Sequence, residues 1–272
     1  MILLEDTAAD ILRKAQRGLD LSDSQLAERA GLDADRVRRL RDGQIDDETL
    51  EAVAPVLHLD PVSLKKLARN QWIPEEVKEL KGLAQFNTTY GDMTVNAYLA
   101  WDPASREAVA FDTGADCTGI LDCEKREKLT VKLILLTHSH PDHVADLARL
   151  RKETGAPIYI SALESAPDAE SFEEGKRFKC GALRIEALLT SGHSAGGTTF
   201  VITGLERPVA IVGDSLFAAS MGGGAVSYQD ALRNNREKIL TLLYETIVCP
   251  GHGPLTTVGK EKRENPFFAE RS

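Results

Sequence analysis

The chain has 272 residues, of which 42% are hydrophobic and 28% are charged. This composition is typical of a folded protein with one or two cores, and it excludes a disordered or fibrous chain. The sequence carries 33 Lys and Arg against 42 Asp and Glu, which gives a net charge of −9. Nucleic-acid binding over the whole surface is therefore excluded, and any basic patch must be local.

The N-terminus and the cysteines indicate a cytoplasmic protein. Glu5 and Asp6 stand where a secretory signal has a basic start, and no stretch approaches the roughly 18 apolar residues of a membrane-spanning helix. The four cysteines are too few for a disulfide framework, and none lies in a Cys-x-x-Cys pair. We expect a cytoplasmic protein without membrane association, whose thiols are structural.

Residues 1–75 are predicted to form a small all-helical domain. Apolar residues at helical spacing predict helices over 6–17, 22–30, 33–42, 47–57 and 61–68. Ser22 and Gln25 have the spacing of a capping box, and Asp33 is expected to cap the third helix. Gly31 supplies the tight turn between the second and third helices, which is the plan of a helix-turn-helix.

Residues 21–68 resemble the Cro/repressor-type helix-turn-helix family, through the spacing of Gln25, Ala27 and Gly31 and the helix that ends at Gly43. The resemblance implies that Arg36, Arg38, Arg39 and Arg41 on the third helix would contact DNA. However, residues 1–75 hold 11 Lys and Arg against 15 Asp and Glu. This acidic domain disfavours DNA as a partner, and we predict instead that it forms a homodimer or covers one edge of the second domain.

Residues 76–272 are predicted to form an α/β layered domain, because short apolar strands alternate with helices. Strands are expected over 94–101, 108–111, 132–137, 157–160, 183–189, 198–202, 209–212 and 246–249. Helices are expected over 144–154 and 228–243.

One short run after the strand at 132–137 concentrates residues that bind metals. His138, His140, Asp142 and His143 fall within six positions. Imidazole and carboxylate together suit zinc, or iron and manganese where oxygen ligands are mixed in. A loop that leaves a buried strand lets these side chains point at one small volume, so we predict a metal site here.

Other ligand-type residues each lie in a glycine-containing turn at the end of a predicted strand. Small neighbours let the backbone approach an ion closely in such turns. The residues concerned are Asp112, His193, Asp214 and His252.

Taken together, these motifs resemble the metallo-β-lactamase superfamily from Ala84 to Ser272. The resemblance implies an αββα sandwich, preceded in this chain by the helix-turn-helix domain. It implies that His138, His140 and His193 hold one metal ion, that Asp142, His143 and His252 hold a second, and that Asp214 bridges them. Asp112 would form hydrogen bonds beside the site without being a ligand. A missing cysteine ligand and the bridging Asp214 disfavour antibiotic hydrolysis.

Within the superfamily, the segment from Pro250 to Phe267 resembles small bacterial glyoxalase II-like hydrolases. The predicted function is a metal-dependent hydrolysis of a thioester or ester by a metal-bridged hydroxide, with Asp142 and Asp214 as catalytic residues. Two divalent ions are expected, with zinc favoured over iron or manganese. The small-molecule substrate is expected to contact Met221 and Tyr228, in the glycine-rich loop after Asp214.

Two other functions stay open from the sequence. Persulfide dioxygenases share much of the pattern and use a single iron on positions that match His138, His193 and Asp214. The other is a DNA-binding regulator, in which the helix-turn-helix domain binds DNA and the metallo-β-lactamase-fold domain acts as a sensor.

Overall fold

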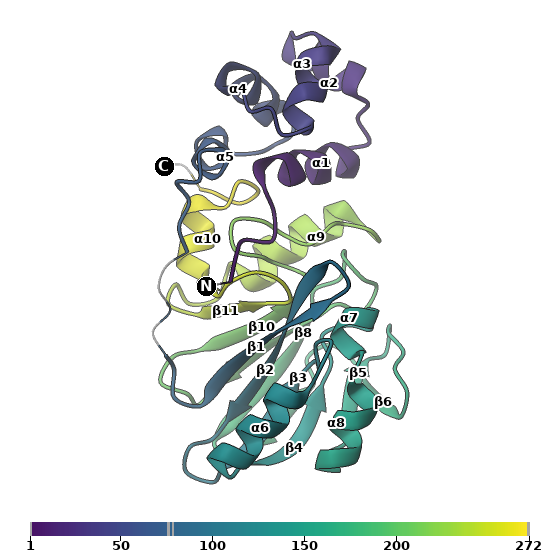
Figure 1. Ribbon diagram of the computed structural model, residues 1–272, viewed down its shortest axis with the longest axis vertical. Coiled ribbons are helices and arrows are strands. Elements are labelled where there is room, and N and C mark those ends of the chain that lie inside the picture. Colours follow the sequence, from purple (N-terminus) through teal and green to yellow (C-terminus); the bar gives the residue numbers. More distant parts are fainter. Residues whose placement is uncertain (1, 75–76, 78, 271–272) are drawn as a thin grey trace.

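The computed structural model describes residues 2–74, 77 and 79–270. The boundary predicted between residues 75 and 76 lies outside these residues. The chain up to residue 74 contains α1 (Ala8–Gly18), α2 (Asp23–Ala30), α3 (Ala34–Arg41), α4 (Asp47–Val56) and α5 (Pro61–Ala68). We call α1–α5 the helical part, and it stands at one end of the molecule (Figure 1).

Local hydrogen bonds explain where these helices begin. Ser22 and Gln25 form the predicted capping box, in which each side chain accepts a hydrogen bond from the other residue's backbone N–H. Thr7 and Asp10 form a second capping box at α1. Asp33 occupies the predicted capping position of α3, but its side chain makes no capping hydrogen bond.

The described residues after residue 79 form two mixed sheets. The first has the order β1-β2-β3-β4-β5-β6 and the second β12-β11-β10-β9-β8-β7. The strands of the first sheet are β1 (Leu83–Tyr90), β2 (Met93–Trp101), β3 (Glu107–Phe111), β4 (Thr130–Leu135), β5 (Ile158–Ser161) and β6 (Ala169–Phe172). Those of the second are β7 (Arg177–Cys180), β8 (Leu183–Leu189), β9 (Thr198–Thr203), β10 (Val209–Gly213), β11 (Ile247–Pro250) and β12 (Thr256–Thr257).

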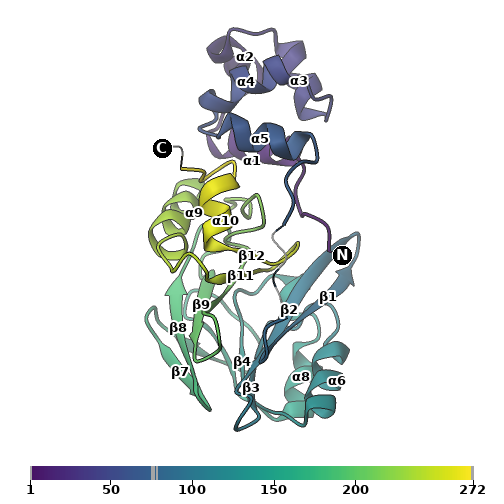
Figure 2. The same ribbon diagram turned by 90° about the vertical axis from the view of Figure 1, so that its left-hand side faces the viewer.

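Helices cover the outer faces of the two sheets and complete an αββα sandwich (Figure 2). They are α6 (Thr118–Glu127), α7 (Pro141–Val144), α8 (Leu147–Thr154), α9 (Tyr228–Asn234) and α10 (Val258–Glu264). In β10, Val209 and Ile211 belong to the core between the sheets, whereas Ala210 and Val212 belong to the core on the outer face. This alternation explains why the predicted strand reads as a continuous apolar run: both of its faces are buried.

The helical part shares a hydrophobic core with the sandwich. One cluster joins Ile11 and Leu64 of the helical part to Val248 of β11, Val258 of α10 and Phe267. A backbone hydrogen bond of 2.7 Å from Asp60 N to Pro266 O adds to this contact. The helical part therefore covers one end of the sandwich, which is one of the two roles that the sequence predicts for it.

Two predicted helices are shorter than expected. The helix predicted over 144–154 is interrupted between α7 and α8, where the Asp146 carboxylate accepts a hydrogen bond from Cys117 N and Asp146 N donates to Thr113 Oγ1. The helix predicted over 228–243 passes into a π-helical turn, Asn235–Ile239, and ends there. The Asn235 amide donates to Ser215 O and Ala231 O, and such insertions disturb the regular helical ladder.

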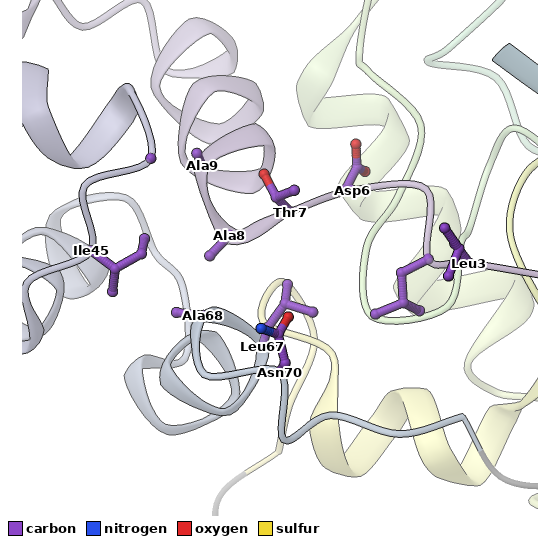
Figure 3. Close-up of a pocket in the computed structure, with 11 residues that line it drawn as sticks. Leu3, Asp6, Thr7, Ala8, Ala9, Ile45, Leu67, Ala68 and Asn70 are labelled. Atoms are coloured by element: carbon purple, nitrogen blue, oxygen red, sulfur yellow. The ribbon is translucent and has the colours of Figure 1, made fainter.

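A cavity of about 440 Å³ lies where the N-terminal segment enters α1. Figure 3 shows its wall, formed by the segment from Leu3 to Ala9, by Ile45 before α4 and by Leu67 and Asn70 at the end of α5.

All four cysteines are buried free thiols. Among the described residues, no helix has the length and apolarity needed to cross a membrane.

Candidate metal centre

The predicted ligands follow the carboxyl ends of strands in both sheets. His138 and His140 follow β4, and α7 then carries Asp142 and His143. Further ligands follow strands of the second sheet: His193 comes after β8, Asp214 directly after β10 and His252 after β11. Because β8, β10 and β11 point the same way, their ends meet at one edge of the sandwich.

Four side chains form the first candidate ligand group, His138, His140, His193 and Asp214, with one ligand atom of each within 4.8 Å of the others. His193 Nε2 lies 3.0 Å from His140 Nδ1 and 3.2 Å from Asp214 Oδ2. The group is the set that the family resemblance implies for one metal ion, together with the residue that it implies as the bridge.

Three side chains form the second group, Asp142, His143 and His252, under the same distance limit. Asp142 Oδ2 lies 3.6 Å from His143 Nε2 and 3.4 Å from His252 Nε2. All three side chains are buried. The structure thus brings together all seven residues predicted as ligands.

Asp214 connects the two groups. Its Oδ1 lies 3.3 Å from His143 Nε2, and its Oδ2 lies 3.4 Å from His252 Nε2 and 3.2 Å from His193 Nε2. Its side chain is only 7% exposed. A carboxylate in contact with histidines of both groups is placed to bridge two cations.

Unsatisfied buried atoms test whether this centre fits metal ions. His138 Nε2, His143 Nε2 and Asp214 Oδ1 are buried without a hydrogen-bond partner among the described residues. Such atoms are rare in folded proteins because desolvation without a new partner is unfavourable. All three belong to the two ligand groups, so cations held there would satisfy them.

Hydrogen bonds fix the far side of four ligand imidazoles. His143 Nδ1 donates to Asp112 Oδ2 at 2.8 Å, and His193 Nδ1 donates to Gly223 O at 3.0 Å. His252 Nδ1 donates to Thr94 O at 2.6 Å, and His138 Nδ1 contacts Thr137 Oγ1 at 3.0 Å. These contacts turn each Nε2 toward the two ligand groups and hold the ring in one orientation.

Asp112 has the role that the resemblance implies. It lies outside both ligand groups, and its carboxylate accepts hydrogen bonds from His143 Nδ1, from Thr137 Oγ1 at 2.7 Å and from Thr137 N at 2.8 Å. Its φ of 56° is left-handed, a region that Asp and Asn tolerate better than other residues with side chains.

We expect Asp112→Asn to lower metal affinity about 10- to 100-fold, because the amide removes one acceptor from behind His143. Competition with a chelating dye measures this change. Asp168→Asn is the control, because Asp168 is exposed and has a φ of 58°. Equal affinities of the two variants would show that Asp112 does not support the ligand.

Opposing effects act on the protonation of the histidines. Burial disfavours the charged form of His143, but the Asp214 charge and the hydrogen bond to Asp112 outweigh it and raise its pKa to about 10. Burial also disfavours the charged form of His252, but Asp214 and Asp142 outweigh it and raise the pKa of His252 to about 11. At His138 burial prevails, and the pKa lies well below its usual value. Without metal, His143 and His252 are therefore protonated at neutral pH.

Metal uptake should consequently depend on pH. A histidine must lose its proton to become a ligand, so cations compete with protons at His143 and His252. We expect apparent metal affinity to rise between pH 7 and pH 9 by up to about tenfold per pH unit for each proton released. Chelator competition at a series of pH values measures the slope. A flat profile would contradict proton release on binding.

Glycines allow two neighbouring turns to approach Asp214 closely. A Cβ on Gly251 would lie 2.1 Å from Asp214 Oδ1 and 2.7 Å from His143 Cε1, and one on Gly222 would lie 1.8 Å from Asp214 O. Any side chain at either position would occupy the space of the ligands.

Met221 and Tyr228, the predicted substrate contacts, are packed in the core between α1 and the sandwich. Met221 is 0% exposed and Tyr228 7% exposed, and the Tyr228 ring fills the space where a Cβ on Gly18 would lie. Burial gives both side chains a packing role in this structure, and their contact with substrate stays a prediction.

Sequence reasoning missed two neighbours of the centre that come from the N-terminus. A Cβ on Gly253, next to His252, would lie 3.3 Å from Glu5 N. The ammonium of Lys14 lies 5.0 Å from the centre of the Phe217 ring, which is itself 5.6 Å from the His252 ring. No local motif marks Glu5 or Lys14, because their position depends on how the helical part packs.

This fold and this arrangement of histidines and aspartates define a metallo-hydrolase of the αββα type. Residues 90–252 match the family model described as "Metallo-beta-lactamase superfamily". The chain belongs to this superfamily, and the family match begins only after α1–α5.

Individual relatives agree with this assignment. The chain is 31% identical over 202 residues to "Hydroxyacylglutathione hydrolase GloC" of Haemophilus influenzae, covering 65% of this chain and 94% of the relative. The solved structure of "BLEG-1 B3 metallo-beta-lactamase" is 31% identical with a TM-score of 0.61, covering 69% of this chain and 100% of that one. The structure of "TTHA1623 in a di-iron-bound form" is 29% identical with a TM-score of 0.54, covering 67% and 100%.

Proposed function

We propose that the protein hydrolyses a thioester or ester with two divalent metal ions, in the manner of hydroxyacylglutathione hydrolases. The observation that carries the proposal is Asp214, whose two carboxylate oxygens lie within 3.4 Å of histidines in both ligand groups. The similarity to GloC supports thioester hydrolysis, and the di-iron relative supports two ions. Zinc is the proposed metal, with iron or manganese as alternatives.

Each residue of the centre has its own role in this proposal. His138, His140 and His193 would hold one ion and Asp142, His143 and His252 the other, with Asp214 between them. Bound divalent ions would supply hydroxide at neutral pH and polarise the carbonyl to be attacked. Asp142 and Asp214 supply the negative charge that retains two cations in a buried site. Asp112 keeps His143 oriented through its hydrogen bond.

Metal analysis together with activity assays tests this proposal. Protein purified without chelator should hold about two divalent ions per chain and hydrolyse S-lactoylglutathione or a neutral aryl ester. One iron per chain, no hydrolysis and oxygen uptake with glutathione persulfide would instead establish the dioxygenase. Hydrolysis of a β-lactam alone would overturn the proposed substrate class while retaining the metal chemistry.

DNA binding by α3 would require free guanidinium groups. Arg36 pairs with Asp46 and Glu48, Arg38 pairs with Asp35, and Arg41 pairs with Asp23. Phosphates would have to displace these carboxylates, which adds to the unfavourable net charge of the helical part.

We expect no shift of a DNA duplex by the protein at about 10 μM in low salt, the condition that favours non-specific binding most. A gel-shift assay measures this. A shift that weakens with salt, and that Arg39→Ala reduces, would instead support the regulator.

A further inference from the structure

The segment before α1 lies against a turn of the metal centre. A Cβ on Gly253 would lie 3.3 Å from Glu5 N, 3.6 Å from Leu3 O and 3.7 Å from Glu5 Cβ. Gly253 follows the ligand His252, and its carbonyl accepts a hydrogen bond from the buried Asn96 amide at 2.8 Å. Residues 3–5 therefore form part of the wall beside His252, although they lie outside the family match.

Polar contacts on both sides fix this segment. Ser220 Oγ and Lys14 Nζ each donate to Asp6 Oδ2 at 2.5 Å. Lys14 also donates to Met221 O at 2.9 Å, which ties α1 to the loop after Asp214. Figure 3 shows Asp6 and Leu3 on the stretch that leads into α1. The N-terminal segment is thus anchored at the residue next to Glu5.

Glu5 brings a carboxylate that forms no ion pair of its own among the described residues. Lys14 is paired with Asp6, and within the described part of the chain the Glu5 carboxylate has no hydrogen bond or ion pair. The side chain is half-buried. Burial raises the pKa of Glu5, the positive charges of His252 and Lys14 lower it, and the negative charges of Asp6 and Asp214 raise it. Glu5 is absent from both ligand groups, so its side chain begins beside the turn that carries His252 without being a ligand there.

We propose that Glu5 is a specificity residue that shifts the metal centre toward substrates with a cationic group and away from substrates with a carboxylate. The inference rests on the proposed hydrolase function. A half-buried carboxylate attracts an ammonium group and repels a carboxylate more strongly than an exposed one, because solvent screens it less. The segment before α1 would thereby contribute directly to substrate choice.

Three thioesters of the same acid test this inference: acetylthiocholine, S-acetylmercaptoacetate and the neutral ethyl thioacetate. The measured quantity is kcat/KM for the cationic thioester divided by kcat/KM for the anionic thioester. For Glu5→Gln we expect this ratio to fall about tenfold, while kcat/KM for the neutral thioester stays unchanged. Glu5→Lys should move the ratio further in the same direction. Glu28→Gln is the matched control, because Glu28 is exposed on α2, on the far side of the helical part from the sheets (Figure 1).

Binding of the product thiols supplies a readout that does not need turnover. Titration calorimetry of thiocholine and mercaptoacetate, on proteins of equal measured metal content, should show weaker binding of the first and tighter binding of the second in Glu5→Gln. If all three thioesters resist hydrolysis while the thiol affinities still shift, the proposed function fails and the inference stands. If the neutral thioester is hydrolysed but neither ratio nor affinities change, the inference is overturned and the function survives.

Discussion

Asp214→Asn is expected to leave less than one metal ion per chain and to lower turnover by about 10³-fold. The carboxylate lies within 3.4 Å of His143, His193 and His252, so in the proposed bridging role its loss would remove a ligand from both ions at once. An amide carries no charge and can offer only its carbonyl oxygen to a single ion. Metal analysis and steady-state kinetics measure the two effects separately.

The size of this effect distinguishes a bridge from an ordinary ligand. Asp142 belongs to only one group, so Asp142→Asn should lose about one ion and keep the other. Asp168→Asn, on the exposed surface, should retain the metal and activity of the parent protein. If Asp214→Asn kept one ion as Asp142→Asn does, with similar turnover, Asp214 would serve a single ion and the bridging assignment would fall.

Gly251→Ala is expected to lower turnover about 100-fold although it changes no ligand. The new methyl group would lie 2.1 Å from Asp214 Oδ1 and 2.7 Å from His143 Cε1, which is well inside van der Waals contact. The backbone has little room to yield, because Gly251 N donates to Gly213 O at 2.8 Å and Gly251 O accepts from Asn96 N at 2.7 Å. The ligands must therefore shift, and metal affinity should fall with activity.

Gly223→Ala provides the matched comparison. Gly223 also lies beside the centre, where its carbonyl accepts the hydrogen bond from His193, but a Cβ there meets no atom within 4 Å. The Gly223→Ala variant should keep the activity of the parent protein within about twofold, because a methyl group in open space displaces no neighbouring atom. Unfolding curves for both variants check that Gly251→Ala remains folded. Full activity of Gly251→Ala would mean that the centre is more plastic than the close contacts indicate.

The ligand set could be predicted from the sequence because each ligand is locally marked. His138 follows a strand within a dense histidine run, and Asp214 and His252 stand in glycine-containing turns after strands. Parallel strand ends meet at one edge of a sheet, which accounts for the residues after β8, β10 and β11, whereas the residues after β4 join them only because the two sheets pack together. Which oxygen of Asp214 faces which histidine depends on the packing of the two sheets, and no local pattern encodes it.

Features that depend on contacts between distant parts of the chain could not be predicted from the sequence. Helical spacing continues past Asn235, but the hydrogen bond from its amide to Ser215 O accompanies a π-helical turn over Asn235–Ile239, after which the helix ends. Asp146 interrupts another helix through contacts with Cys117 and Thr113. Met221 and Tyr228 read as loop residues beside the site, yet packing against α1 buries them. Each case is decided by a partner far away in the chain.

The core shared between α1–α5 and residues 210–268 also affects the order of folding. During synthesis the helical part emerges first, but its apolar faces are completed by β11, α10 and Phe267, which are made much later. Until then, Ile11 and Leu64 lack part of their native cover, which is the condition that favours aggregation or chaperone binding. In the complete chain, we expect the helical part to unfold together with the face of the second sheet that it covers, because the two share one core cluster.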